Sequence, residues 1–336
     1  MHIPDGFLDA KTAAAAGVLS AAAIGTSIYQ CGKHLPRKKV PLMGLSAAFV
    51  FAAQMLNFPV AGGTSGHLLG GVLASVLLGP SAAVLVLTSV LTVQCFLFSD
   101  GGLTALGANI FNMGVISSVG GYYLYQALWR LMPTRRGQIT SIAVAAWVTT
   151  VLASIVCAGE LAASGTIAWS VAFPAMAGVH MLIGIGEAII TCMVVVAISQ
   201  ARPDLLSSDP TAVPAGGRSY REFIIYGLLI AAGLALFISP FADKNPDGLD
   251  RVSEKLGFAN REPKQPLHWS PMPNYLMPSV PSVTIATSLA GIAGTGVAFL
   301  LGLGLARVLV RDQAESDDSA QDHPGQGPPE SLPSSS

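Results

Sequence analysis

The first two residues, Met1 and His2, carry a set of nitrogen donors that can chelate a metal ion. A free N-terminal amine, the amide nitrogen of residue two and its imidazole close fused rings around an ion that displaces the amide proton. Such a planar nitrogen set suits Ni²⁺ or Cu²⁺ and also admits Co²⁺, whereas Zn²⁺ prefers a tetrahedron. One corner of the plane stays open, and His67 is the candidate to fill it.

This chelate requires that Met1 stays on the chain. Initiator methionine is normally removed only before a small residue, and His2 is large, so we expect Met1 to be retained. Ile3-Pro4 then restricts the backbone, and Asp5-Gly6 is a turn signal. The terminus is therefore expected to fold back before the first apolar segment begins.

Several other polar residues are candidates to orient these ligands through hydrogen bonds, as residues next to metal ligands commonly do. Asp100 in FSDGG, and Asn109 and Asn112 in GANIFNMG, are expected near the same mouth of the protein. Ser65, two residues before His67, and His180 complete this set of candidates.

His180 and Glu187 stand seven residues apart in HMLIGIGEA, on one face of an apolar helix. An ionisable group within a membrane helix needs a partner. Two interpretations remain open, hydrogen bonding between helices or, for Glu187, a place on an ion path.

The composition is that of a membrane protein. Of 336 residues, 51% are hydrophobic and only 11% are charged, whereas soluble domains carry about 25% charged residues. The net charge of -1 excludes a basic face for nucleic acid. The four cysteines show no CxxC spacing and are interpreted as small core residues. We therefore expect a lipid bilayer as the partner of the surface.

Apolar runs predict an all-α, polytopic transmembrane helix bundle. The candidate spans number nine: 10–30, 41–57, 67–79, 81–98, 105–130, 139–161, 175–200, 223–239 and 282–306. Most of the 18 Lys and Arg residues fall in alternate loops, which predicts an external N-terminus and a cytoplasmic C-terminus in the cell membrane.

The chain is expected to divide into a seven-span part and a two-span hairpin. Residues 1–200 form the first part, 201–222 a flexible cytoplasmic linker, and 223–310 the hairpin with an external loop at 240–281; residues 311–336 are expected to be a disordered cytoplasmic tail.

The external loop contains one short helix signal, NPDGLDRVSEKLGF. Asn245 is the expected N-cap, Pro246 the first helical residue and Gly257 the stop. Leu249, Val252 and Leu256 would then share a face that docks onto the seven-span part.

Four ordered blocks make the chain resemble the CbiM/NikM family, the substrate-capturing membrane component of energy-coupling-factor transporters for cobalt and nickel. They are MHIPDGFLD at 1–9, GGTSGHLLGG at 62–71, FSDGGLTALGANIFNMG at 98–114 and HMLIGIGEA at 180–188. The resemblance covers about residues 1–200. It implies that Met1, His2 and His67 hold Ni²⁺ or Co²⁺, the transported substrate, in a plane.

Residues 223–310 look like the small PDGLE (CbiN/NikN-like) partner component, here fused in frame, although the motif ends in Asp250 where the family has Glu. In that family the component assists metal loading. The resemblance also implies two further subunits, a transmembrane coupling subunit (CbiQ/NikQ-like) and an ATPase (CbiO/NikO-like). No GxxxxGK[ST] motif occurs in this chain, so energy from ATP would come from such partners.

Two other functions remain as alternatives. Ser65 in the string GTSG, together with His180, would suit an intramembrane serine protease, although small residues are common in membrane helices. A self-sufficient secondary transporter would use His180 and Glu187 as a proton relay.

Overall fold

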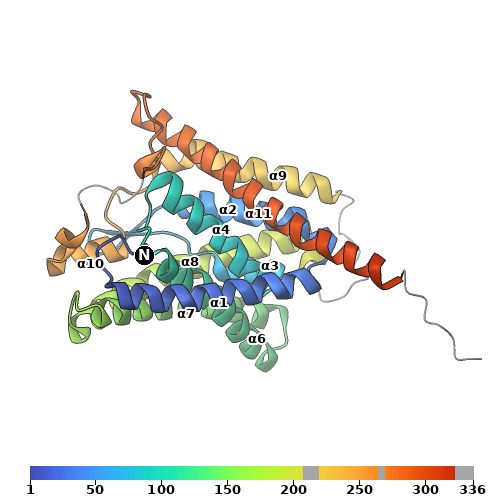
Figure 1. Cartoon of the computed structure of the whole chain (residues 1–336), viewed down its shortest axis with the longest axis horizontal. Coiled ribbons are helices and arrows are strands. Elements are labelled where there is room, and N and C mark those ends of the chain that lie inside the picture. Colours follow the sequence, from blue (N-terminus) through green and yellow to red (C-terminus); the bar gives the residue numbers. More distant parts are fainter. Residues whose placement is uncertain (207–218, 264–268, 322–336) are drawn as a thin grey trace, which may run out of the picture.

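The helices of the chain lie roughly along one long axis, and the N-terminus is at the same end as the short helix α10 (Figure 1). The computed structural model describes residues 1–206, 219–263 and 269–321, with side chains described as far as residue 310. Apart from one short antiparallel pair of strands, the regular structure of these residues is helical. The chain is thus an α-helical bundle.

The N-terminal part is built from eight α-helices and a strand pair. In chain order its elements are α1 (Ala10–His34), η1 (Arg37–Lys39), α2 (Val40–Gln54), β1 (Phe58–Val60), β2 (Thr64–Gly66), α3 (Gly71–Leu78), α4 (Pro80–Phe98), α5 (Leu106–Asn109), η2 (Ile110–Gly120), α6 (Gly121–Leu131), α7 (Arg135–Ala163) and α8 (Trp169–Ala201). Helix α4 lies in the middle because it is apolar on all sides, and most of it is buried.

The C-terminal part is a helical hairpin with an insert. Its elements are η3 (Pro203–Leu205), α9 (Tyr220–Gly233), η4 (Leu234–Ile238), η5 (Ser239–Phe241), α10 (Gly248–Leu256), η6 (Ala259–Arg261), η7 (Pro273–Tyr275) and α11 (Val283–Gln321). Helices α9 and α11 both pack on α2. Small residues allow the approach of α11, since Gly294 lies against the Phe51 ring and Gly302 against Ala47.

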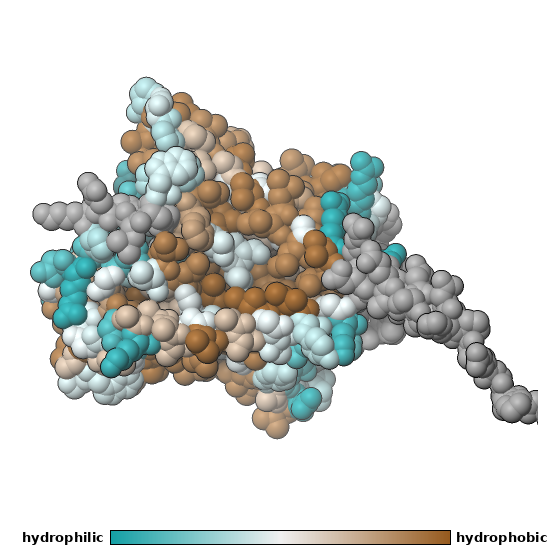
Figure 2. Space-filling view, viewed as in Figure 1, coloured by the Kyte–Doolittle hydropathy of each residue, from teal (hydrophilic) through white to brown (hydrophobic). Residues whose placement is uncertain are grey.

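The described residues contain six helical segments that are long and apolar enough to cross a membrane. They are α1, α4, α7, α8, Tyr220–Phe241 and Val283–Val310. Figure 2 shows a broad apolar surface across the middle of the molecule and hydrophilic residues gathered toward both ends. This distribution matches a protein whose middle lies in the hydrocarbon of a bilayer.

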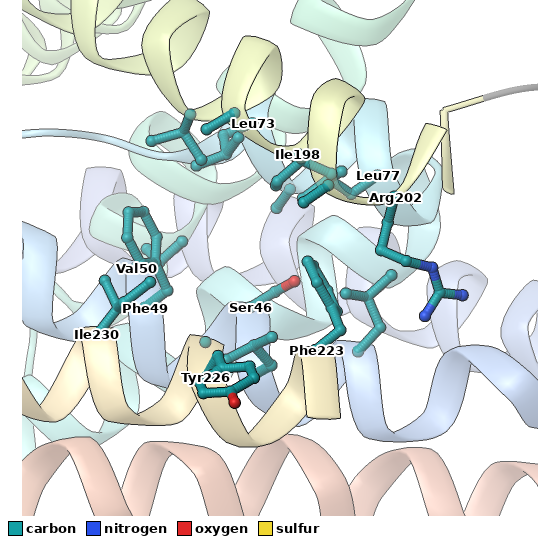
Figure 3. Close-up of a pocket in the computed structure, with 17 residues that line it drawn as sticks. Ser46, Phe49, Val50, Leu73, Leu77, Ile198, Arg202, Phe223, Tyr226 and Ile230 are labelled. Carbon is teal, nitrogen blue, oxygen red and sulfur yellow. The ribbon is translucent and has the colours of Figure 1, made fainter. Parts of the chain in front are cut away.

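The two parts do not fill all the space between them. A cavity of about 310 Å³ lies between α2, α3 and α8 of the N-terminal part and α9 of the C-terminal part (Figure 3). Its walls are mostly apolar, and Arg202 lies at one end of it. The Arg202 guanidinium forms a bidentate ion pair with Asp204.

The third expected span begins later than the sequence indicates. We expected a helix from residue 67, but α3 begins at Gly71. Residues 64–66 pair with 58–60 instead, and Gly70 has a φ of +82°, a left-handed conformation that a helix cannot extend through. His67 therefore lies on irregular chain before the helix, and the predicted helical start at 67 is wrong.

Two expected boundaries in the C-terminal part also differ. Ser219 and Glu222 form a capping box, so α9 starts at Tyr220 and shortens the expected linker; residues 207–218 of that linker lie outside the described residues. Helix α11 is described as far as Gln321, beyond residue 311 where the tail was expected to begin. No Pro or Gly occurs between Gly304 and Pro324, and extending an existing helix needs no new nucleus. Residues 322–336 lie outside the described residues.

The helix in the loop starts at a different residue from the one expected. Asp247, not Asn245, is the N-cap of α10, because its side chain accepts from the backbone N–H groups of Leu249 and Asp250. Gly257 ends the helix in a left-handed conformation, as predicted. Leu249 and Val252 are buried, but Leu256 is 38% exposed and does not share in the docking face.

We expect the substitution Gly294→Ala to destabilise the packing of α11 on α2. An added methyl group would collide with the Phe51 ring and lie 2.7 Å from Cζ of Phe98, and overpacking of this kind costs about 1–3 kcal/mol. Gly296→Ala is the matched control, because nothing lies within 4 Å of its added Cβ. Thermal unfolding of the purified protein in detergent should show a lower midpoint for Gly294→Ala alone. Equal midpoints would contradict this packing.

Candidate metal site

The N-terminal segment enters the interior of the protein. Met1, His2 and Ile3 are all buried. Both backbone groups of Ile3 are paired, since its N–H donates to Oδ1 of Asn109 at 2.7 Å and its carbonyl accepts from Nδ2 of Asn109 at 3.0 Å. The same carbonyl accepts from the N–H of Gly102 at 2.8 Å. These bonds fix the chain immediately after His2.

The turn predicted at Asp5-Gly6 is present. Oδ1 of Asp5 accepts from the backbone N–H of Thr104 at 2.8 Å and from its hydroxyl at 2.6 Å. Gly6 has a φ of +85°, and a side chain there would collide with the carbonyl of Arg261. The terminus thus folds back between the loop after α4 and the insert of the C-terminal part.

His67 lies on an irregular segment that Glu187 holds in place. The two carboxylate oxygens of Glu187 accept from the backbone N–H groups of Leu69, at 2.5 Å, and Gly70, at 3.0 Å. Nδ1 of His67 lies 3.0 Å from the carbonyl of Leu68 and must donate to it. Nε2 of His67 therefore carries the free lone pair.

The amine of Met1 lies between a nitrogen and a carboxylate. It is 2.9 Å from Nε2 of His67 and 2.5 Å from Oδ2 of Asp247. Metal–nitrogen bonds of about 2.0–2.1 Å at a right angle place neighbouring donors about 2.9 Å apart. Met1 and His67 thus already stand at the separation of adjacent ligands.

Burial is the main cause that lowers the pKa of His67, and the nearby N-terminal ammonium lowers it further. The imidazole is therefore neutral near pH 7, which is the form that binds metals.

His2 packs beside His67 and contacts a second carboxylate. The two imidazole rings are stacked, with centroids 5.2 Å apart. Nδ1 of His2 is 3.0 Å from Oδ1 of Asp100, and Nε2 is 3.2 Å from Oε1 of Gln94. The hydroxyl of Tyr275 donates to Oδ2 of Asp100. Burial raises the pKa of Asp100, but the contacts with His2 and Tyr275 and the nearby His67 together lower it further, to about 2.

Asp247 is the residue of this cluster that sequence reasoning missed. One donor atom each from His2, His67 and Asp247 lies within 4.8 Å of the others. Burial opposes ionisation of Asp247, but the N-terminal ammonium holds its pKa well below the usual range. The available signal was its motif: a carboxylate between Pro246 and Gly248, in a loop expected on the same side as Met1.

The remaining candidates lie at different distances from the cluster. The hydroxyl of Ser65 donates to the carbonyl of Asn245, and Nδ1 of His180 donates to the carbonyl of Met176. His180 lines a cavity of about 10 Å³ together with Met1 and His67. Asn112 donates instead to Glu160. Asn109, Asp100 and His180 thus lie at the N-terminal segment, whereas the side chain of Asn112 bonds elsewhere.

Nitrogen and carboxylate donors gather at one end of an apolar helical bundle, an arrangement that suits a membrane protein that binds a metal ion. Residues 2–205 match the family described as the cobalt uptake substrate-specific transmembrane region, CbiM, and residues 221–311 match the PDGLE domain. The chain belongs to the CbiM family and carries a PDGLE domain in the same polypeptide.

Relatives and solved structures agree with this assignment. A protein of Archaeoglobus fulgidus with the provisional name fused nickel transport protein NikMN is 36% identical over 309 residues, which cover 91% of this chain and 98% of that protein. The cobalt transport protein CbiM of Geobacter sulfurreducens is 31% identical over 289 residues, 80% of this chain and 81% of that protein. A crystal structure of a transition metal transporter is similar with a TM-score of 0.54 and 34% identity, covering 60% of this chain and 93% of that one.

We expect Asn109→Leu to release the N-terminal segment. The change removes both side-chain bonds to Ile3. The Ile3 carbonyl keeps its bond from Gly102, but the buried N–H loses its partner, and such a loss costs about 1–3 kcal/mol. Hydrogen exchange of residues 1–9, measured by mass spectrometry on protein in detergent, should become faster. Asn112→Leu is the control, since Asn112 bonds to Glu160. The same exchange rate in both variants would refute the role given to Asn109.

Proposed function

We propose that this protein is the substrate-binding membrane subunit of an energy-coupling-factor, ABC-type importer that captures divalent nickel or cobalt at an external site. The observation that carries the proposal is the approach of the Met1 amine to Nε2 of His67, at the spacing of adjacent metal ligands. The transport names of the relatives support the choice of nickel and cobalt.

The proposed ligands are the amine of Met1, the amide nitrogen and Nδ1 of His2, and Nε2 of His67. The arriving ion would displace one proton from the Met1 ammonium, one from the His2 amide and the proton on Nδ1 of His2 that faces Asp100. Nδ1 of His2 exchanges its contact with Asp100 for the ion. Four nitrogens in a plane favour Ni²⁺ and also admit Co²⁺.

The proposed topology has nine spans, seven in the N-terminal part (1–200) and two in the hairpin (223–310), with the N-terminus outside and the C-terminus in the cytoplasm. The excess of basic residues in alternate loops supports this orientation. In this topology the loop at 240–281 and Met1 face the same side, consistent with the contact between Asp247 and Met1.

Transport would need partners, because the chain has no P-loop motif. We propose that a CbiQ/NikQ-like coupling subunit and a CbiO/NikO-like ATPase bind at the cytoplasmic loops around Gly79-Pro80 and Arg135-Arg136. Both loops lie at the ends of helices, α3 and α4 for the first and α7 for the second.

The contacts give less support to the two alternatives. The hydroxyl of Ser65 donates to a backbone carbonyl and not to His180, as a protease dyad would require. Glu187 accepts from Leu69 and Gly70, an arrangement that holds the His67 segment. A proton relay through His180 and Glu187 would leave the buried N-terminus without a function.

Removing either imidazole should abolish tight metal binding. We expect His2→Ala and His67→Ala each to weaken Ni²⁺ and Co²⁺ binding by at least about 100-fold, because each loses a ligand of the plane. Isothermal titration of the purified protein with each ion measures this effect. His34→Ala, at the exposed end of α1, should bind as the unchanged protein does. Full binding by both site variants would contradict the proposal.

Extending the chain by one residue before Met1 should also abolish binding, because the amine then leaves the chelate and the space beside His67 is enclosed. The intact mass of the unextended protein should include Met1. A protease or a secondary transporter would tolerate the extension. Metal binding that survives the extension would exclude the amine as a ligand.

A further inference from the structure

A carboxylate from the C-terminal part reaches the N-terminal amine. Oδ2 of Asp247 is 2.5 Å from the Met1 nitrogen and 3.7 Å from Nε2 of His67. We propose that Asp247 is the counter-ion of the metal site: it holds the Met1 ammonium beside His67 before the ion arrives, and it balances the charge of the loaded site afterwards. This inference rests on the proposed function, since it assumes the nitrogen ligands described above.

The two oxygens of Asp247 have separate contacts. Oδ1 accepts from the N–H groups of Leu249 and Asp250 and so caps α10, whereas Oδ2 contacts Met1. The cap fixes the direction of the carboxylate, because Oδ1 cannot leave the helix end without exposing two N–H groups. Oδ2 is therefore held toward the amine.

The loop before Asp247 is attached directly to the segment that carries His67. The N–H of Ser65 donates to the carbonyl of Pro246 at 2.9 Å, and its hydroxyl donates to the carbonyl of Asn245 at 2.7 Å. These bonds couple the position of Asp247 to that of His67, two residues beyond Ser65.

The residue after Asp247 fits closely over the N-terminal part. A side chain on Gly248 would lie 2.7 Å from Cε1 of His180, so only glycine allows this approach. Leu249 and Val252 belong to the same apolar cluster as Met1, Ile3 and Phe7. Residues of the insert thus contact the N-terminal part both before and after Asp247 in the sequence.

The Met1 ammonium is buried, and Asp247 is the carboxylate that it contacts. A buried positive charge without such a partner is strongly disfavoured. Asp100 contacts His2 instead, so Asp247 is the negative group that faces the amine.

The proposed ligand set leaves no corner of the plane for Asp247. Its Oδ2 is 2.5 Å from the Met1 nitrogen and 3.7 Å from Nε2 of His67, so the amine is the nearer of the two. The four nitrogens already fill a square plane. Asp247 therefore acts on the ion through charge and through its hold on the amine.

The test compares nickel binding by the full-length chain, purified in detergent, and its Asp247→Asn and Asp247→Ser variants. Asn and Ser both retain the helix cap through a side-chain oxygen, but neither carries a negative charge to the amine. Glu254→Gln is the matched control, because it removes one negative charge from an exposed position of the same helix. Circular dichroism and gel filtration establish that each variant is folded.

We expect isothermal titration with NiCl₂ to show affinity weakened by about tenfold or more in both Asp247 variants and unchanged in Glu254→Gln. The visible absorption band of bound Ni²⁺ should keep its position in all of them, because the four nitrogen ligands remain. Affinity equal to that of the unchanged chain in both Asp247 variants would overturn the inference, and a displaced band would show Asp247 to be a ligand. Absence of binding by the unchanged chain would instead refute the proposed function itself.

Discussion

The ammonium group of Met1 is buried between one nitrogen and one carboxylate, and much of the structure serves to place these three groups. A positive charge inside a protein is tolerated only beside partners that replace its water. Asn109 fixes the chain after His2, and Glu187 fixes the segment after His67. The cap of α10 fixes Asp247. Residues from three separate parts of the sequence thus position the Met1 amine and its two partners.

The irregular backbone near this site also needs hydrogen-bond partners, because the protein lies in a membrane. Residues between α2 and α3 are not helical, and backbone groups that face lipid must find partners within the protein. The strand pair β1 and β2 satisfies some of them, and Glu187 satisfies Leu69 and Gly70. The C-terminal part supplies others, since Pro246 accepts from Ser65 and the N–H of Asp243 donates to Asn57. The insert thus supplies hydrogen-bond partners to the irregular backbone between α2 and α3.

Much of the helical architecture could be predicted from the sequence, because long apolar runs bounded by polar residues have few other solutions in a bilayer. The fold-back at Asp5-Gly6 and the end of α10 at Gly257 followed from local turn chemistry. The start of α3 did not, since the small residues before Gly71 suit a helix as well as an extended strand.

Part of the candidate site could also be predicted. His2 and His67 were expected together, and the structure stacks their rings. Asp247 was not expected there, because its place depends on which residue caps α10 and on how the insert docks. Both are tertiary effects: Asn245 is an equally good cap by type, and the loop that carries both residues is held by bonds from Ser65 of the N-terminal part. The role of Asn109 toward Ile3 likewise needs the fold.

The contact between Met1 and Asp247 joins residues that are 246 positions apart in the chain. Contacts so distant in sequence form late, because a long loop must close before they stabilise anything. During synthesis the Met1 amine is made first, and the Asp247 carboxylate follows only after about three quarters of the chain has been made. Until then the N-terminal part is present without the carboxylate of the insert. The candidate metal site is thus among the last features of the protein to be completed, although it begins at residue one.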